Sequence, residues 1–576
     1  MRLKQYFFIS IFALCCLNLF SCTSSRLQLI ENPQGTPISA YSLEAKNAMV
    51  VAPNEQISQI GKQILQGSQT QAGGNAVDAA IAASFAMSVL RPQSTGLGGG
   101  GFMLIYLKEK NQTMVLDFRE RAPLKADSKL YGGNTKLSQE GPLAVATPGL
   151  VAGLWEAYQQ FGSQKIAWED LLAPAIRLAE EGFAVYPHLA MASEQQKKIL
   201  PELFLPKGAP LKVGDILIQK DLAKTLRVIA KTGATDFYRG GIADQIVKTL
   251  AKSGGILQKR DLLEYQVVQR KPVDGTFLGY HIVSMPPPSS GGIHLIEILN
   301  ILEKSPLPKK GYGHVQTIHW MIEAMRRAYA DRARYLGDPD FISIPSMGLL
   351  SKSYAEDLAT SILPDKATPR GSLSQPVLSP HESSSTAHIS VVDAEGNAVA
   401  TTQTINYYFG SGIVVPGTGI VLNDEMDDFA LKPGVANVFG LVGGDANSIQ
   451  PGKRPLSSMT PTMVFDPKGK LFMVVGSPGG SRIITTVAQI LINSIAYQAP
   501  PLKSIAAARI HHQWLPDEVY YEKGALSDKT IKMLTKMGHV MKPSDLFVTD
   551  TQLIQRKGDV WIGVSDPRWN GRPAGY

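Results

Sequence analysis

Hydroxyl side chains stand directly before a run of β-forming residues in the sequence HESSSTAHISVV, which begins at His381. A hydroxyl becomes an effective nucleophile when a base lies beside it. A threonine at a chain start supplies its own base, because a free α-amine has a pKa of about 7.7–8.0 and is partly neutral near pH 7–8. Two interpretations are open: a polar linker into an ordinary hairpin, or a chain that is cut so that Thr386 becomes a catalytic N-terminus.

A β-hairpin is predicted to follow these hydroxyl residues. The runs AHISVV and NAVATTQTIN favour strands, and DAEGN between them favours a three-residue loop with Gly396 in the left-handed conformation. That loop pairs Asp393 with Asn397, and the same register places Thr386 opposite Thr404. Directly opposed threonines lie close enough for their hydroxyls to hydrogen-bond. The register therefore predicts a contact between these two side chains.

A second candidate is the glycine turn in VVGSPGGSRIITTVAQ. An apolar strand is expected to end at Gly476 and a helix to begin near Ser481. Gly479 and Gly480 would leave backbone N–H groups free at that helix N-terminus, which suits an anion or a developing oxyanion. The alternative is a tight turn with a purely structural role.

Acids, serines and histidines complete the candidates. The acids of NDEMDDF (Asn423–Phe429) could hold a cation or a metal, or they could form a solvated loop. Ser457 and Ser458 are adjacent in KRPLSSMTPT, and His511 and His512 are expected to be structural. The earlier GLGGGGF lacks the Lys-Ser/Thr of a phosphate-binding loop, so nucleotide binding is not expected there.

The pattern predicts the elements that would position these residues. GLGGGGFMLIYL is typical of a glycine turn entering a buried strand, and residues 364–385 contain four prolines and no period, which indicates a loop. Thr147 is expected as an N-cap, with Pro148 at the first helical position and Gly162 as the end of that helix. The other long helices are predicted over residues 75–90, 291–304 and 314–337.

Composition places the chain among globular proteins. It has 576 residues, of which 44% are hydrophobic and 18% charged, enough for one large domain or several average ones. The net charge of +8 comes from scattered basic residues. The densest group, Arg326–Tyr335, is expected to be the solvated face of a helix, so no nucleic-acid partner is expected.

The N-terminus is expected to direct export. Residues 1–21 have a basic start and a short apolar run, typical of a signal peptide. The sequence LFSC resembles a lipobox, which predicts lipidation of Cys22 and a lipidated tether over residues 22–45. Thr23 favours the outer membrane, so the expected location is the periplasm with an outer-membrane anchor. No disulfide is expected in the mature domain, because the cysteines are Cys15, Cys16 and Cys22.

Ten motifs occur in one order from about Met49 to the C-terminus. The first half of the chain carries GGNAVDAAIA, GLGGGGFM, LDFRERAP, TPGLVAG and PPPSSGGIH. The second half carries STAHISVVD, NDEMDDF, VGGDANSIQPGKRPLSSMTPT, GSPGGSRI and HHQWLPDE. Together these ten motifs resemble the γ-glutamyltranspeptidase family.

The resemblance implies an N-terminal-nucleophile hydrolase of the α+β class with a four-layer αββα sandwich. It also implies that the precursor cuts itself between Ser385 and Thr386. The products would be a large subunit of residues 46–385 and a small catalytic subunit of residues 386–576, which remain together as a heterodimer. No cofactor and no metal are implied.

The resemblance further implies a role for each matching residue. The residues expected at the reaction centre are the nucleophile Thr386, the orienting Thr404, and the oxyanion-hole residues Gly479 and Gly480. The residues expected to bind the substrate's α-carboxylate are Arg119, Ser457 and Ser458. The residues expected to accept from its α-ammonium are Asn406, Glu425 and Asp428. Donors would be glutathione and other γ-glutamyl compounds, and acceptors water, an amino acid or a dipeptide.

Two positions depart from the family pattern. Ala387 stands where relatives usually have a second threonine, so a hydroxyl beside the nucleophile is absent. Phe439 stands where some bacterial relatives have tyrosine, in a segment expected to be the lid. We expect it to form a pocket wall without a hydroxyl anchor and to shift the ratio of hydrolysis to transfer.

Two alternatives remain open from the sequence. Cephalosporin acylases, which act on glutaryl side chains, share the fold and the self-cleavage. An inactive, uncleaved binding lipoprotein is the other alternative, and it would never turn substrate over.

Overall fold

The computed structural model describes residues 29, 36–68, 72–369, 385–432, 434–544 and 549–576. The predicted signal peptide, Cys22, most of the predicted tether and the loop residues 370–384 lie outside the described residues. Within the described ranges, no helix combines the length and the apolar character that a membrane span requires.

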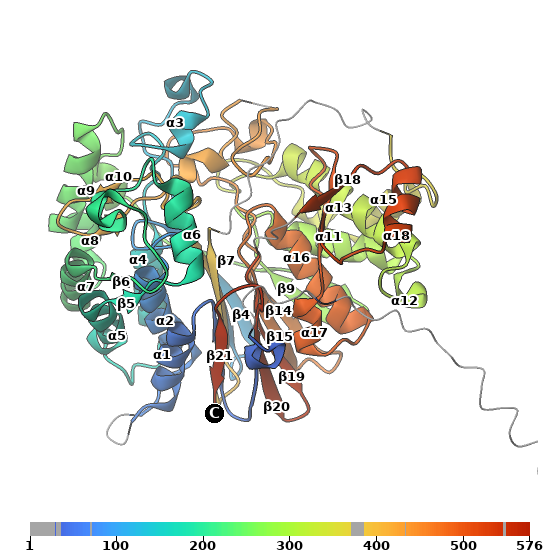
Figure 1. The fold of residues 1–576 in the computed structure, drawn as a ribbon, viewed down its shortest axis with the longest axis horizontal. Helices are drawn as coiled ribbons and strands as arrows, with labels where there is room; N and C mark the ends of the chain where they lie inside the picture. Colours follow the sequence, from blue (N-terminus) through green and yellow to red (C-terminus); the bar gives the residue numbers. More distant parts are fainter. Residues whose placement is uncertain (1–28, 30–35, 69–71, 370–384, 433, 545–548) are drawn as a thin grey trace, which may run out of the picture.

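Two seven-stranded antiparallel sheets form the centre of the molecule (Figure 1). The first sheet has the order β21 (Arg572–Gly575), β2 (Met49–Ala52), β10 (Ala387–Val392), β11 (Ala398–Thr404), β3 (Gly100–Leu107), β4 (Gln112–Phe118), β7 (Val268–Arg270). The second has the order β1 (Ser42–Ala45), β20 (Val560–Ser565), β19 (Gln552–Lys557), β15 (Leu471–Gly476), β14 (Thr462–Phe465), β9 (Tyr280–Ser284), β8 (Val273–Phe277). Buried side chains from both sheets pack against each other, among them Phe102, Leu104, Met463, Val474 and Ile554.

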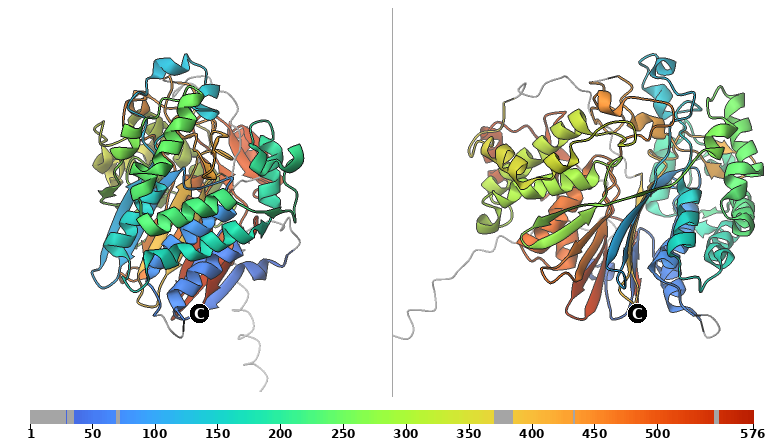
Figure 2. Two further views of the ribbon diagram at one scale, coloured as in Figure 1. Left: turned by 90° about the vertical axis from the view of Figure 1, so that its left-hand side faces the viewer. Right: turned by 180° about the vertical axis from the view of Figure 1, so that it is seen from behind.

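Helices cover the outer face of each sheet, as the two further views show (Figure 2). The helices on the side of the first sheet include α1 (Glu55–Gln66), α2 (Ala76–Leu90), α4 (Leu150–Phe161), α5 (Trp168–Glu181) and α7 (Lys220–Thr232). Those on the side of the second include α11 (Gly291–Glu303), α13 (Val315–Tyr335) and α16 (Arg482–Leu491). The predicted four-layer αββα sandwich is confirmed.

Shorter elements surround these layers. The remaining α-helices are α3 (Lys136–Gln139), α6 (Pro187–Gln196), α8 (Thr235–Arg239), α9 (Gly241–Lys252), α10 (Lys259–Leu263), α12 (Leu307–Lys310), α14 (Ser346–Leu349), α15 (Lys352–Thr360), α17 (Pro501–Ala506) and α18 (Asp528–Lys536). The remaining strands are β5 (Phe183–Ala184), β6 (Ile216–Leu217), β12 (Val414–Val415), β13 (Ile420–Val421), β16 (Ile510–His511), β17 (Val519–Glu522) and β18 (Met541–Ser544).

Most of the predicted elements are confirmed, but one helix start is wrong. Helices α2, α11, α13 and α16 and strand β3 lie where the pattern predicts them. Helix α4 begins at Leu150 after Gly149, not after Thr147. Thr147 instead forms a backbone bridge with Arg121, with N–O distances of 2.8 and 3.2 Å. This long-range pairing holds the residue extended and overrides its capping preference.

The basic group on α13 is not a solvated face, which corrects the prediction. Arg326, Arg327 and Arg332 are all buried. Arg326 forms an ion pair with Asp517 at 2.8 Å, and Arg327 forms one with Glu323 at 2.6 Å. Helical spacing alone could not reveal this burial. Asp517, the partner of Arg326, lies almost 200 residues further along the chain.

The fold begins earlier than the boundary expected at residue 45. Strand β1 pairs with β20 along its whole length, and Tyr41 before it is fully buried. The Arg572 guanidinium lies 3.7 Å from the centre of the Tyr41 ring, a cation–π contact. Residues 41–45, predicted as part of the tether, therefore belong to the folded domain.

Candidate active site

The two threonines meet as the hairpin register predicts. Strands β10 and β11 pair Ala387 with Gln403 and Val392 with Ala398, so the next pair outward is Thr386 and Thr404. Their Oγ1 atoms are 3.0 Å apart. Side chains alternate along a strand, so Thr386 shares a face with residues that point toward the second sheet. The hydroxyl pair therefore lies at the end of the sandwich.

The backbone of Thr386 is strained. Its φ is +100°, a region that β-branched residues rarely adopt and that costs about 1–3 kcal/mol. The Thr386 N–H donates to the Ser94 carbonyl at 3.2 Å, and the Ser385 hydroxyl donates to the Asn406 carbonyl. Contacts on both sides of the Ser385–Thr386 bond thus hold this conformation.

A small pocket opens beside the hydroxyl pair. It encloses about 20 Å³, roughly the room of one water molecule. The lining brings together residues more than 300 positions apart in the sequence. They are Arg119, Thr386, Thr404, Asn406, Glu425, Asp428, Phe439, Leu441, Ser457, Ser458, Met459, Gly480 and Ile483.

Arg119 is the central charge of the pocket and is fully buried. Its guanidinium forms ion pairs with Glu425 and, at 2.5 Å, with Asp428. Burial lowers the pKa of Arg119, but these carboxylates outweigh burial and raise it above its ordinary value. Burial raises the pKa of Glu425 and of Asp428. The solvated-loop interpretation of the acidic motif is therefore wrong, because its acids close around an arginine.

Ser457 and Ser458 also line the pocket. The Ser457 hydroxyl accepts the N–H of Met459 at 3.1 Å, which leaves its own proton free to be donated into the pocket. The backbone of Ser457 is tied to the turn before α11, since its N–H donates to the Pro288 carbonyl at 2.8 Å and its carbonyl accepts from Ser290.

Asn406 connects the threonines to the acidic motif. Its N–H donates to the Thr404 hydroxyl at 2.8 Å, and its side-chain amide donates to the Asp424 carbonyl at 3.1 Å. That N–H occupies one lone pair of Thr404 Oγ1, which leaves one lone pair and the hydroxyl proton for the contact with Thr386.

The glycine turn lies where it was predicted, and Phe439 lies against it. Gly480 lines the pocket at φ +53°, and Gly479, at φ +130°, precedes it in the same turn at the start of α16. A Cβ at Gly480 would come within 2.5 Å of the Phe439 ring, so only glycine fits there. Phe439 forms a pocket wall, as predicted, and its effect on the transfer ratio stays a prediction.

Sequence patterns did not identify two residues that bond the segment expected to be the lid. The Asn437 amide donates to Asp428 Oδ1 at 3.0 Å, and its Oδ1 accepts the N–H groups of Phe439 and Leu441 at 3.0 Å. Asp427 accepts the N–H of Val438 at 2.8 Å. The adjacent acids of NDEMDDF were the available signal, because one of them faces the pocket and its neighbour faces the lid.

Comparison with known proteins gives one consistent family. The model of the family described as gamma-glutamyltranspeptidase matches residues 57–576. The glutathione hydrolase proenzyme of Escherichia coli (strain K12) is 46% identical over 541 residues, covering 92% of this chain and 91% of that protein. The chain belongs to the γ-glutamyltranspeptidase family.

Solved structures agree with this family assignment. The Helicobacter pylori gamma-glutamyltranspeptidase chain is 43% identical, with a TM-score of 0.52, and covers 55% of this chain and 91% of its own length. The cephalosporin acylase from Bacillus halodurans is 29% identical, with a TM-score of 0.81, and covers 95% of this chain and 99% of that one. The acylase shares the fold over the whole length but is the more distant relative in sequence.

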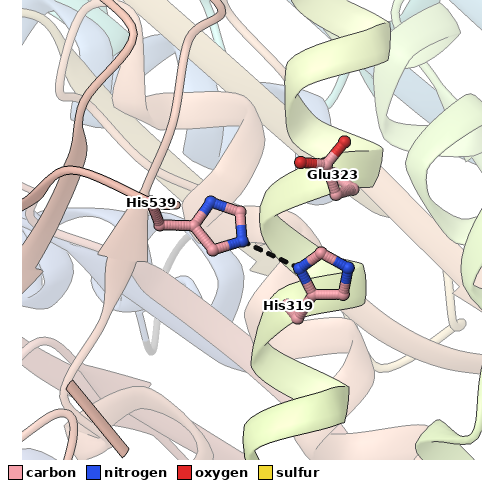
Figure 3. A group of neighbouring side chains, drawn as sticks. All are labelled: His319, Glu323 and His539. Atoms are coloured by element: carbon pink, nitrogen blue, oxygen red, sulfur yellow. Dashed lines mark hydrogen bonds between the residues drawn. The ribbon is translucent and has the colours of Figure 1, made fainter. Parts of the chain in front are cut away.

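A separate cluster of polar side chains could be taken for a metal site (Figure 3). Ligand atoms of His319 and Glu323 on α13, and of His539, lie within 4.8 Å of one another. However, the Glu323 carboxylate already accepts from Arg327 at 2.6 Å and from the Thr368 N–H at 3.1 Å. Two arginines, Arg326 among them, already neutralise this region, which disfavours a buried dication. We interpret the group as polar packing.

The two histidines of this group are neutral partners. His319 Nε2 lies 2.7 Å from the Leu363 carbonyl, which can only accept, so the Nε2 of His319 carries the proton. His539 Nε2 therefore donates to His319 Nδ1 at 2.8 Å. Burial lowers the pKa of His539 to about 3 and also lowers that of His319.

The His319–His539 pair is expected to make the unfolding free energy decrease as the pH falls. Between pH 6.5 and about 3, His539 takes up a proton when the chain unfolds but not while it is folded, so the unfolding free energy decreases as pH falls. His539→Gln keeps the donor to His319 and cannot ionise. We expect the slope of unfolding free energy against pH to become shallower by about 1.4 kcal/mol per pH unit in this window.

Denaturant unfolding followed at several pH values measures this slope. His281→Gln is the matched control, because His281 is about half exposed and its ion-pair partner Asp274 is exposed. Equal slopes for His539→Gln and the wild type would contradict the prediction.

Proposed function

We propose that this chain is a γ-glutamyltransferase and glutathione hydrolase made as a self-cleaving precursor. The observation that carries the proposal is the Thr386–Thr404 hydroxyl pair, 3.0 Å apart, in one pocket with Arg119 and the acids Glu425 and Asp428. That pocket supplies a nucleophile together with opposite charges that suit a zwitterionic substrate.

The precursor is proposed to cut itself at Ser385–Thr386. The Thr386 hydroxyl attacks the Ser385 carbonyl, the amide nitrogen leaves as the Thr386 α-amine, and water hydrolyses the resulting ester to a Ser385 carboxylate. The φ torsion of Thr386 includes the carbonyl carbon of Ser385. Cleavage of the Ser385–Thr386 bond therefore removes this strained torsion. The ground-state strain favours this reaction.

Turnover would use the same hydroxyl. The freed α-amine accepts the Thr386 hydroxyl proton as the oxygen attacks the γ-amide, and N–H groups of Gly479 and Gly480 face the oxyanion. The amine product leaves with a proton, Cys-Gly when the donor is glutathione. Water then resolves the acyl-enzyme by hydrolysis, or an amino acid or dipeptide accepts the γ-glutamyl group.

Selection of the γ-glutamyl end would follow from charge. Arg119 offers two parallel N–H donors to a carboxylate, and Ser457 and Ser458 offer hydroxyl protons to it. The acceptors proposed for the α-ammonium are Asn406, Glu425 and Asp428. Because Glu425 and Asp428 pair with Arg119 in the free pocket, binding exchanges one set of ion pairs for another.

The comparisons support both cleavage and substrate class. The Escherichia coli relative is named a glutathione hydrolase and a proenzyme. The match to the Helicobacter pylori structure covers 91% of that chain but only 55% of this one. This is the coverage expected if that chain is one subunit of a cut precursor. We further propose a heterodimer of a large subunit that ends at Ser385 and a small subunit of residues 386–576, exported and anchored through Cys22.

Two anilides test the proposal against the acylase alternative. We expect purified protein to release p-nitroaniline from γ-glutamyl-p-nitroanilide at least about 100-fold faster than from glutaryl-p-nitroanilide, which lacks the α-ammonium that Glu425 and Asp428 would bind. The reverse preference would favour a cephalosporin acylase, and no turnover with an uncut chain would favour a binding lipoprotein.

A further inference from the structure

Arg332 is a second buried arginine beside the pocket. It lies in the last turn of α13, only 4% exposed, where the helix C-terminus favours a cation. Its Nε donates to the Ser290 hydroxyl at 3.0 Å, and its Nη2 donates to the Ser458 hydroxyl at 3.4 Å. Both of these hydrogen-bond partners are serine hydroxyls, and neither is a carboxylate.

These contacts fix the direction of two hydroxyl protons. A guanidinium can only donate, so each serine oxygen must accept from it and direct its own proton elsewhere. Ser290 shows this directly, because its hydroxyl donates to the Ser457 carbonyl at 2.8 Å. Ser458 lines the pocket, and its proton is left for an acceptor there. Arg332 therefore supports Ser458 directly and Ser457 through Ser290.

The charge of Arg332 adds to this effect. Burial lowers its pKa, the nearby Asp428 raises it and Arg119 lowers it further, but a guanidinium remains ionised. Arg119 lines the pocket, and Arg332 contacts the pocket residue Ser458, so two positive charges lie close to the same small volume. Both attract an anion that binds between Arg119 and the serines, which favours a carboxylate at that point.

We propose that Arg332 is a positioning residue for the α-carboxylate of the substrate, acting through the hydroxyls of Ser458 and Ser290. This inference rests on the proposed function. A hydroxyl that already accepts from a cation is a stronger and better aligned donor to the carboxylate. Loss of Arg332 should therefore weaken substrate binding more than it slows the chemical step.

A double-mutant cycle with γ-glutamyl-p-nitroanilide tests this inference. We expect Arg332→Gln to raise KM about 10-fold with kcat within about 3-fold. In a Ser458→Ala background the same change should raise KM by no more than about 3-fold, because the hydroxyl it orients is gone. Arg332→Lys, which keeps the charge, should give an intermediate KM and the same non-additivity.

The controls separate positioning from a structural role. Arg334→Gln removes an exposed guanidinium that lies over Tyr335 on the same helix, and it should leave KM unchanged. Equal KM effects in both backgrounds, or a loss of kcat at constant KM, would overturn the inference. If Arg332→Gln is not cut into two chains, the Arg332→Lys cycle decides on the same criterion. An inactive wild type would overturn the proposed function, and this inference with it.

Discussion

Thr386→Ala is expected to leave the protein as one uncut chain with activity at least about 10⁴-fold below the wild type. The change removes the hydroxyl that contacts Thr404 across the hairpin, at 3.0 Å, and with it both the attacking atom of self-cleavage and that of turnover. A denaturing gel with N-terminal sequencing checks it. Wild type should give two bands, the smaller beginning Thr-Ala-His at residue 386.

Two further variants make this result specific. Thr386→Ser keeps a hydroxyl and, after cleavage, an α-amine, so it should still be cut and keep measurable activity. Thr232→Ala removes a hydroxyl from the exposed end of α7, where it bonds only the Val228 carbonyl, and should behave as wild type. A cut and active Thr386→Ala would refute the assignment of the nucleophile. An uncut wild type would instead direct attention to Ala387, the departure next to the scissile bond.

The hairpin could be predicted from sequence because its determinants are local. Gly396 at φ +87° fixes the three-residue loop, and the loop fixes the register that brings Thr386 to Thr404. A shift by one residue would have turned every side chain of the strand to the other face. The three-residue loop excludes that shift, so two residues 18 positions apart could be placed together.

The ion pairs between Arg119 and the acids of the same pocket could not be predicted in the same way. Arg119 and Glu425 are 306 positions apart, and only the packed sandwich shows that they contact each other before any substrate arrives. The family resemblance assigned both residues to substrate and gave no indication of this mutual pairing. The burial of the arginines on α13 was likewise hidden, because their partners lie on other segments: Arg326 pairs with Asp517, and Arg327 bonds Ser361.

Arg332 illustrates the limit most clearly. It stands in a basic helical run that the spacing assigns to solvent, and no motif marks it. Its contacts with Ser290 and Ser458 depend on how α13 packs against the turn before α11 and on the return of residues 457–458 to the same place. Positioning residues of this kind appear only after the fold has joined distant segments.

Arg119→Gln is expected to raise KM for γ-glutamyl-p-nitroanilide at least about 100-fold and to destabilise the protein by about 3–5 kcal/mol. The substrate carboxylate loses its bidentate partner, and Glu425 and Asp428 are left buried without the cation that both now contact. Because burial already raises the pKa of both acids, the variant should take up protons there and lose least stability at low pH. Kinetics and unfolding at pH 5 and 8 measure both effects.

Arg119→Lys and Arg260→Gln separate charge from geometry. Lysine keeps the positive charge and should retain most of the stability, but it cannot form two parallel hydrogen bonds, so KM should still rise about 10-fold. Arg260 forms an exposed ion pair with Glu264 on the surface, and its loss should leave both the unfolding free energy and KM close to the wild-type values. If Arg119→Gln bound substrate as the wild type does, the carboxylate would have to be held by the serines and Arg332 alone, and the ion-pair exchange proposed for binding would be wrong.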